Sequence, residues 1–289
     1  MIHAASFFSL RRKDLLNTEM KNRIFFGTLM IAVMVLVVFL SPLTRLLGFL
    51  AVGIACAWEY KTRLKEKDIP VALWILVVFL VAAAALAWTN RVSVGWPVLL
   101  GASVMLTMGY GVYEKSRGGV AAVYTLAGIL YPGFLFALVM HISQTSWWLQ
   151  TLMLACLSTW VCDSAAMLGG RRFGKHKLAA TVSPNKTVEG AVWGAASSLV
   201  VGVICWLLGR WFPAVGGMNL IACMVTCLLA STMGQLGDLA ESLLKRMLGV
   251  KDFSNLIPGH GGMFDRADSL LFSIPTAYLC IMVYTMLAV

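Results

Sequence analysis

Charged residues and glycines are concentrated in one short segment of an otherwise apolar chain. Residues 242–268 read SLLKRMLGVKDFSNLIPGHGGMFDRAD, whereas only 12% of the 289 residues are charged. Because charge is costly at membrane depth, a chain this apolar keeps it there only where it has a use. Cations, carboxylates and a Gly-Gly backbone in one segment suit a metal-bound polyphosphate. The residues concerned are Lys245, Arg246, Lys251, Asp252, His260, Asp265, Arg266 and Asp268, around Gly249, Gly259, Gly261 and Gly262.

Two aspartates, Asp238 and Asp265, are the main candidates for metal-binding chemistry. We expect Asp238 on the helix before the charged segment and Asp265 at the start of the last helix, after a turn through residues 258–262. The two carboxylates can then meet at the neck of a helical hairpin, where their oxygens suit Mg²⁺ and leave room for substrate phosphates. Salt bridges to Lys245 or Arg266 are the alternative role. The sequence does not rank three further candidates to support the metal or contact substrate: Glu241, Asp252 and Asp268.

A polar stripe runs along the helix expected to carry Asp238. Its residues recur at steps of three and four, which places them on one face. A helix end whose polar face meets cytoplasmic water is the simpler explanation. Because the stripe begins well inside an apolar stretch, it favours the wall of a polar, cytoplasm-facing active-site cavity, with Asp238 as its deepest carboxylate. The stripe consists of Ser231, Gly234, Gln235, Asp238, Glu241, Ser242 and Lys245.

A second group of candidate binding residues lies between positions 163 and 190. Residues 183–190 read SPNKTVEG and lead into an apolar helix, whose free N–H groups and dipole attract phosphate. Ser-Pro at a helix start is common, and the pattern becomes more specific beside the Gly-Lys-His-Lys block at 174–177. Asp163 can contact ribose, metal or Lys186, or form a structural ion pair. The candidates for substrate binding here are Asp163, Lys175, Ser183, Lys186, Thr187 and Glu189.

Membrane-spanning helices are the elements that must position these residues. The chain is 60% hydrophobic, its mean hydropathy is +0.83, and it contains long apolar runs. We therefore predict an all-α, polytopic integral membrane protein with about nine transmembrane helices. The first, second and fourth of these are short or broken. The predicted spans are 24–40, 43–58, 70–88, 95–113, 119–140, 147–168, 187–209, 219–244 and 269–288.

The charges give these spans an orientation. Of the 23 Lys and Arg residues, all but Arg45, Arg91 and Arg210 fall at one end of the predicted spans, and the 13 Asp and Glu residues fall on the same side. The positive-inside rule therefore places the N-terminus and the site in the cytoplasm. The net charge of +10 then reflects topology and attraction to anionic headgroups, and nothing indicates nucleic acid. Residues 1–23 do not form a convincing cleavable signal.

The polar residues divide the chain by function. They enter the spans only from Asp163 onward, so we separate an N-terminal membrane region, 1–150, from a C-terminal catalytic membrane region, 151–289. The seven cysteines all lie in predicted spans without metal-ligand spacing, and we interpret them as small buried hydrophobes. A row of small residues predicts tight helix packing, either within the chain or in a homodimer. The row is Gly190, Gly194, Ser198 and Gly202.

Two motifs of the chain resemble those of a known family. Ser-x-x-Lys-Arg, four residues, Lys-Asp, and then Ile-Pro-Gly-His-Gly-Gly-x-x-Asp-Arg-x-Asp-Ser closely resembles the C-terminal motif of the phosphatidate cytidylyltransferases, also called CDP-diacylglycerol synthases. The Gly-Lys block followed by SPNKTVEG is similar to a second family motif. The chain departs from the family pattern at Asn185, Val188 and Met167, where a basic residue, Trp and Tyr are frequent. The resemblance covers about residues 160–270.

The resemblance implies an integral membrane nucleotidyltransferase that converts CTP and phosphatidate into CDP-diacylglycerol and pyrophosphate. It implies a Mg²⁺ centre on Asp238 and Asp265, allows a second, monovalent cation, and implies a bacterial-type inner (cytoplasmic) membrane. Lys245 and Arg266 are expected to join these aspartates in catalysis. The remaining candidates are expected to bind substrate: Arg246, Lys251, Asp252, His260, Gly261, Gly262, Glu241 and Asp268. For His260 we favour substrate contact over a general base, because a phosphate monoester is already anionic at neutral pH.

Two other functions compete with this interpretation. A CTP-dependent kinase of polyprenol or other isoprenoid alcohols would also be a membrane enzyme using a cytidine nucleotide, but it should lack the complete C-terminal motif. A membrane transporter could use the polar stripe as a conduction path. Transporters often carry broken helices in both halves, whereas the polar residues here lie in one half and on one face.

Overall fold

The computed structural model describes residues 28, 32–257 and 261–287. Apolar helices dominate it, as predicted. Seven helical stretches in the described residues are long and apolar enough to cross a membrane, and the shorter α3 is apolar as well. The first predicted span, 24–40, lies partly outside the described residues, and its part at 32–40 is helical. The helices are α2 (Pro42–Lys65), α3 (Leu73–Thr89), α4 (Val92–Tyr113), α5 (Gly118–Gly128), α6 (Leu135–Ile142), α7 (Trp148–Phe173), α8 (Val188–Trp211), α9 (Leu220–Leu248) and α10 (Phe264–Leu287).

Several helices extend beyond the predicted spans. Helix α2 continues to Lys65, past the predicted end at 58, and α10 begins at Phe264 rather than 269. In both cases the added turns carry charged residues, which hydropathy alone assigns to loops. The fifth predicted span, 119–140, is interrupted by a π-helical segment, η1 (Ile129–Phe134), in which Tyr131 has non-helical dihedral angles. Pro132 explains the interruption, because proline lacks an N–H and clashes with the preceding turn.

A small β-hairpin, which the sequence did not predict, joins α7 to α8. Strands β1 (Lys177–Ala179) and β2 (Ser183–Thr187) pair antiparallel, with Lys177 opposite Thr187. Pro184 fits this short ribbon because both strands are edges, where proline is tolerated. Thr187 then caps α8, since its Oγ1 accepts a hydrogen bond from Gly190 N at 3.1 Å. The hairpin thus places Lys186 directly before the start of the helix.

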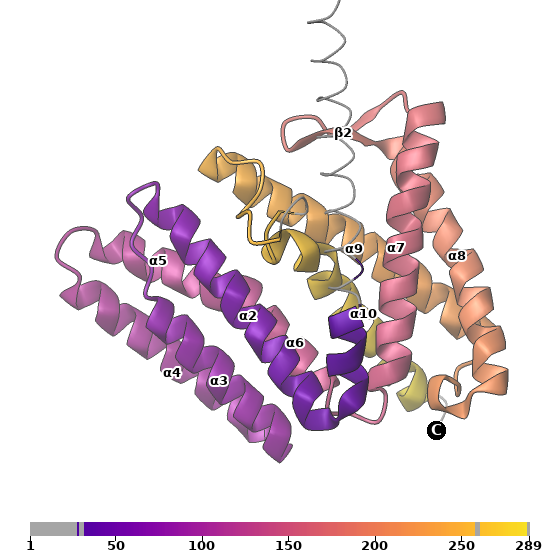
Figure 1. Cartoon of the computed structure of the whole chain (residues 1–289), viewed down its shortest axis with the longest axis horizontal. Coiled ribbons are helices and arrows are strands. Elements are labelled where there is room, and N and C mark those ends of the chain that lie inside the picture. The colour runs from indigo at the N-terminus through magenta and orange to yellow at the C-terminus, as the bar shows by residue number, and fades with distance from the viewer. Residues whose placement is uncertain (1–27, 29–31, 258–260, 288–289) are drawn as a thin grey trace, which may run out of the picture.

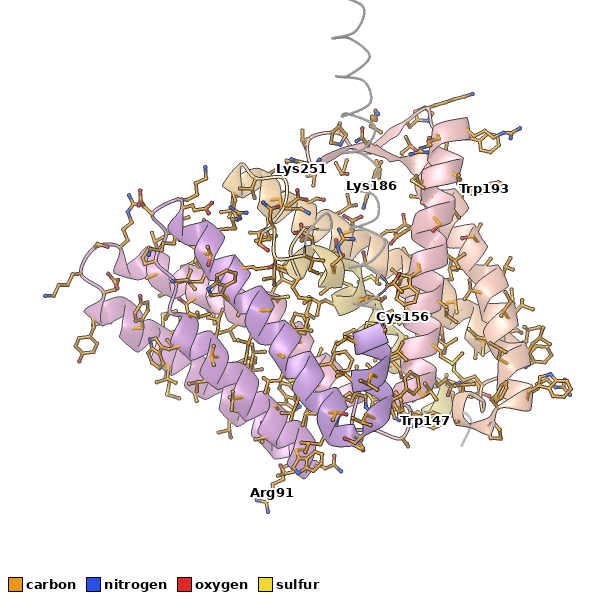
Figure 2. The ribbon with its side chains drawn as sticks, in the orientation of Figure 1. Arg91, Trp147, Cys156, Lys186, Trp193 and Lys251 are labelled. Carbon is orange, nitrogen blue, oxygen red and sulfur yellow. The ribbon has the colours of Figure 1, made fainter. Side chains whose placement is uncertain are left out.

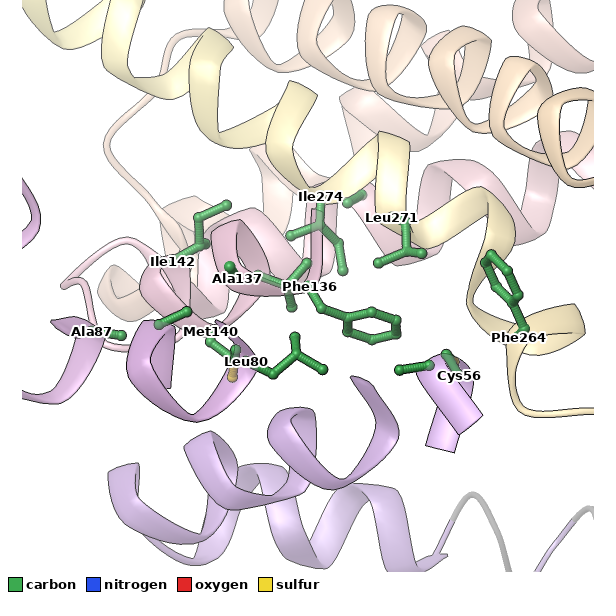
Figure 3. Close-up of a cluster of buried hydrophobic side chains, with 14 of the residues drawn as sticks. Cys56, Leu80, Ala87, Phe136, Ala137, Met140, Ile142, Phe264, Leu271 and Ile274 are labelled. Carbon is green, nitrogen blue, oxygen red and sulfur yellow. The ribbon is translucent and has the colours of Figure 1, made fainter. Parts of the chain in front are cut away.

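Helix α10 packs between the two halves of the molecule. It contacts α7 and α9 as well as α2 and α6, and Figure 1 shows α2 to α6 and α7 to α8 on opposite sides of α10. Figure 3 shows Leu271 and Ile274 of α10 facing Phe136 of α6 within one buried apolar cluster. The N-terminal region, 1–150, and the C-terminal region, 151–289, therefore share one hydrophobic core.

The row of small residues on α8 serves packing within the chain. A Cβ added at Gly194 would lie 2.7 Å from the carbonyl oxygen of Cys162 on α7, and one added at Gly202 would lie 2.5 Å from the Cα of Met224 on α9. Only glycine allows these backbones to approach so closely. Helices α7, α8 and α9 are therefore held together at the positions that the sequence indicated.

Candidate active site

Three carboxylates converge where α9 and α10 meet. Asp238 and Glu241 lie on the polar face of α9, and Asp268 lies one turn into α10. One oxygen of each lies within 4.8 Å of the others, and Glu241 is buried. Helix α9 ends at Gly249, whose φ of 69° gives the left-handed cap that suits glycine. Helix α10 begins at Phe264 and packs against α9, so the predicted pair of adjacent helices is present, whereas residues 258–260 of the predicted turn lie outside the described residues.

Asp265 lies at the same neck but is surrounded by protein donors. Its Oδ1 accepts from Lys245 Nζ at 2.9 Å, and its Oδ2 accepts from the backbone N–H groups of Phe253 at 3.0 Å and Gly262 at 2.8 Å. The residue is 8% exposed. The two aspartates predicted to hold a metal therefore have different surroundings. Asp238 joins the converging oxygens, and Asp265 fastens the segment between α9 and α10 to the start of α10.

Lys245 is a largely buried cation between two carboxylates. Its Nζ forms ion pairs with Asp265 and with Glu241, which lies one turn earlier on α9. Oε2 is the Glu241 oxygen that contacts Lys245 Nζ, and the other buried oxygen, Oε1, has no hydrogen-bond partner among the described residues. Burial of a charge is tolerated when an opposite charge compensates it. Lys245 thus partly neutralises the cluster and leaves Glu241 with unused oxygen lone pairs.

The hairpin contributes a second cation to the carboxylate cluster. Lys186 Nζ on β2 lies 2.5 Å from Asp238 Oδ2, and Arg246 Nε donates to Val182 O at 3.0 Å, which ties the hairpin to the end of α9. Asp163 on α7 interacts electrostatically with both members of the Lys186–Asp238 pair. Figure 2 places Lys186 and Lys251 at one end of the molecule and Arg91 and Trp147 at the other. The candidate site therefore gathers at the basic end.

Glu189 has a local structural role in the linker before α8. Its carboxylate accepts from the backbone N–H of Lys175 at 3.0 Å and of His176 at 3.1 Å, and pairs with His176 Nδ1 at 2.6 Å. A carboxylate in the first turn of a helix also interacts favourably with the helix dipole. Glu189 and Thr187, both predicted to bind substrate, shape the hairpin that carries Lys186.

The remaining predicted residues lie around this cluster. Gly261 and Gly262 border the start of α10, and Gly261 has a φ of 86°, which favours glycine. His260 lies outside the described residues. Met167, at a departure from the family pattern, is 51% exposed on α7. The other candidates are exposed or half-buried cations and polar residues, namely Lys175, Ser183, Arg246, Lys251, Asp252 and Arg266.

Glu59 is a residue near the site that the sequence analysis did not select. It lies on α2, is 0% exposed, and accepts hydrogen bonds from Ser254 Oγ at 2.5 Å and from the N–H groups of Met263 and Phe264 at 2.9 Å each. Because the second predicted span ended at 58, Glu59 was assigned to a cytoplasmic loop. The only signal was a carboxylate directly after a long apolar run.

A separate cavity lies away from these residues. Its volume is about 350 Å³, and it is lined by residues where α8 and α9 join, including Gln150, Arg210 and Asn219. None of the predicted site residues lines it. The polar cavity expected beside the α9 stripe stays a prediction.

Comparison with known proteins identifies the family. A model of the cytidylyltransferase family matches residues 21–284. A phosphatidate cytidylyltransferase of Staphylococcus saprophyticus is 35% identical over 256 residues, which is 84% of this chain and 94% of that protein. One of Bacillus subtilis is 33% identical over 274 residues, or 92% of this chain and 99% of that protein. The chain, with its converging carboxylates and lysines at the neck of a membrane-embedded helical hairpin, belongs to the cytidylyltransferase family.

Proposed function

We propose that the protein is a phosphatidate cytidylyltransferase, which transfers the cytidylyl group of CTP to phosphatidate and releases pyrophosphate. The observation that carries this proposal is the arrangement of Asp238, Glu241 and Asp268 beside two lysines, between apolar helices long enough to cross a membrane. Relatives that match nearly the whole chain and are named phosphatidate cytidylyltransferases support it. A polyprenol kinase or a transporter has no comparable support.

The converging carboxylates fit the Mg²⁺ ion that the family resemblance implies. Their donor set is oxygen only, which Mg²⁺ prefers, and Glu241 Oε1 is buried without a hydrogen-bond partner among the described residues. Asp238, Glu241 and Asp268 would hold the ion. When bound, Mg²⁺ would neutralise charge on the transferred phosphate. Asp265, whose oxygens already accept three hydrogen bonds, would act on this centre through Lys245 and the α10 start.

The lysines would bind the substrate phosphates. Lys186 pairs with Asp238, and its ammonium, near the end of β2 that leads into α8, can turn to the phosphates of CTP as they enter. Lys245 is held by Glu241 and Asp265 and keeps a fixed positive charge near the reacting phosphorus. The attacking oxygen belongs to the lipid phosphate, which is anionic at neutral pH, so the chain needs no strong general base.

Helix α9 can serve both a lipid and a nucleotide. Its polar stripe faces the carboxylate cluster, while Leu229, Leu236 and Leu243, at steps of seven, are 44%, 48% and 59% exposed. Residues seven apart lie on nearly the same side of a helix. This exposed row suits contact with acyl chains, so phosphatidate would reach the cluster sideways from the membrane while CTP enters from the cytoplasm, in an inner membrane of bacterial type.

The test is an assay of the purified protein in detergent. The full reaction contains CTP, phosphatidate and Mg²⁺, and single-omission reactions are the controls. We expect a CDP-lipid only in the full reaction, and none from the Asp238→Asn variant. Formation of a phosphorylated isoprenoid alcohol from CTP, with no CDP-lipid from phosphatidate, would overturn the proposal.

A further inference from the structure

We infer that Glu59, in the N-terminal half of the chain, is a positioning residue for the phosphate-transfer centre. The inference rests on the proposed function and adds a residue outside both sequence motifs. Glu59 does not join the carboxylate cluster. It holds the backbone from which α10 and its acidic residues start.

The contacts of Glu59 are all made to groups that donate hydrogen bonds. Oε1 accepts from Ser254 Oγ at 2.5 Å and Met263 N at 2.9 Å, and Oε2 accepts from Phe264 N at 2.9 Å. The N–H groups at the start of a helix have no partner within the helix, and the helix dipole favours negative charge there. A fully buried carboxylate with three donors is therefore a strong anchor for the first turn of α10.

A continuous set of contacts leads from this anchor to the reacting groups. Phe264 precedes Asp265 on α10, and Asp265 accepts from Lys245 Nζ at 2.9 Å. Lys245 in turn pairs with Glu241, whose carboxylate belongs to the converging cluster. Asp268 lies one turn after Asp265 on α10. A shift of the α10 start would therefore move two acidic residues and one cation of the site together.

Gly262 shows how closely this anchor approaches the backbone. A Cβ added there would lie 2.7 Å from Glu59 Oε2 and 2.9 Å from Asp265 Oδ2. Such contacts do not occur in real side chains, so the position needs glycine if both carboxylates are to reach the backbone N–H groups. Arg63, one turn after Glu59 on α2, donates to Phe253 O and supports the same segment. Helix α2 thus contacts the segment before α10 at two places, at Phe253 through Arg63 and at Met263 through Glu59.

The variant that tests this role is Glu59→Gln, which keeps the size of the side chain. An amide replaces one acceptor oxygen with an NH₂ group, which then faces a donor. The control is Thr125→Val, because Thr125 is also 0% exposed in the N-terminal half and accepts a hydrogen bond from Ala72 N at 3.0 Å, away from the site. Ser254→Ala is a milder variant, because it removes only the hydroxyl that donates to Glu59 and leaves the Glu59 carboxylate unchanged.

Two measurements separate positioning from stability. In steady-state assays, Glu59→Gln should lower kcat about tenfold or more with little change in the KM for CTP, since the residue touches no substrate. Ser254→Ala should change kcat in the same direction by less, and Glu59→Asp should recover part of the loss. Hydrogen exchange should become at least about tenfold faster at Met263 and Phe264 in Glu59→Gln, while Thr125→Val leaves these amides protected.

The outcomes are decisive in either direction. The inference is overturned if Glu59→Gln and Ser254→Ala both leave the amides of Met263 and Phe264 as protected from hydrogen exchange as in the wild type. It is also overturned if Glu59→Gln loses no more kcat than Thr125→Val when the two are compared at equal folded fraction. If Glu59→Gln does not fold, Ser254→Ala and its exchange pattern decide. If the wild-type protein makes no CDP-lipid, the proposed function fails, but the exchange measurement still tests whether Glu59 anchors α10.

Discussion

Lys186 on the hairpin lies 2.5 Å from Asp238 on α9, 52 positions later in the chain. This pair joins the two sequence motifs, because one member belongs to SPNKTVEG and the other to the polar stripe that leads into the C-terminal motif. Lys186 forms an ion pair with the Asp238 carboxylate, which would otherwise be free to bind a metal. Binding of a polyanion and of a cation at this place would thus separate the pair, with each partner taking an opposite charge.

Removal of the hairpin cation should weaken nucleotide binding. We expect Lys186→Ala to raise the KM for CTP about tenfold and to change kcat less, because a lysine that contacts phosphates in both the ground and the transition state contributes uniform binding. Lys177→Ala, an exposed change on β1 of the same hairpin, is the control. Steady-state kinetics at varied CTP measures the effect. Weaker saturation by phosphatidate with an unchanged CTP dependence would assign Lys186 to the lipid.

Metal binding should depend on the converging carboxylates. We expect chelation with EDTA to abolish turnover and added Mg²⁺ to restore it, and Asp268→Asn to raise the Mg²⁺ concentration needed for half-maximal rate by about tenfold. Binding of Mn²⁺, followed by electron paramagnetic resonance, should weaken in the same variant without substrate present. Asp68→Asn, a change at an exposed carboxylate in the turn after α2 that is not among the candidate site residues, is the control. Equal Mn²⁺ affinity in both variants would contradict the assignment of Asp268.

Asp265 should matter for both turnover and stability. Asp265→Asn keeps the size but removes the charge that faces Lys245. We expect kcat to fall below about a tenth of the wild-type value, which means an activation barrier higher by about 1.4 kcal/mol or more. We also expect the free energy of unfolding to fall by about 3 kcal/mol, because Lys245 loses a buried partner charge. Kinetics and thermal unfolding in detergent measure these two quantities. A variant that keeps more than a tenth of the rate would show that the reaction does not need this carboxylate.

The site should face the cytoplasm. Asn255 lies in the exposed segment between α9 and α10, at the basic end, and Ser146 lies exposed beside Trp147 at the opposite end. In a background without the seven native cysteines, Asn255→Cys should react with an impermeant thiol reagent only in inside-out vesicles. Ser146→Cys should react only in right-side-out cells. The reverse pattern would contradict the orientation and the entry of CTP from the cytoplasm.

Regular patterns in the sequence predicted the main structural features of α9. Its polar residues recur with the helical period, and Gly249 marks its end, so the stripe and the helical neck followed from local rules. The small-residue row on α8 was predicted for the same reason. Each of these features depends on neighbours within one or two turns, and such neighbours are visible in the sequence.

Contacts between distant segments were not predictable in this way. Glu59 meets Phe264 across 205 positions, and no period or motif links a carboxylate on α2 to the start of α10. The hairpin was missed because its strands are short and polar, and contacts such as Arg246 with Val182 hold it in place. The different surroundings of Asp238 and Asp265 also depend on tertiary contacts, since Lys245 and the backbone of Phe253 reach only the latter.

The position of the phosphorus that is transferred tests the account most directly. The purified protein is supplied with phosphatidate, Mg²⁺ and CTP labelled with ³²P at either the α or the γ position. Attack of the lipid phosphate on the α-phosphorus predicts that the α label appears in the lipid product and the γ label in pyrophosphate. A γ label in the lipid would indicate a kinase, and an unlabelled lipid in both reactions would contradict cytidylyl transfer by this chain.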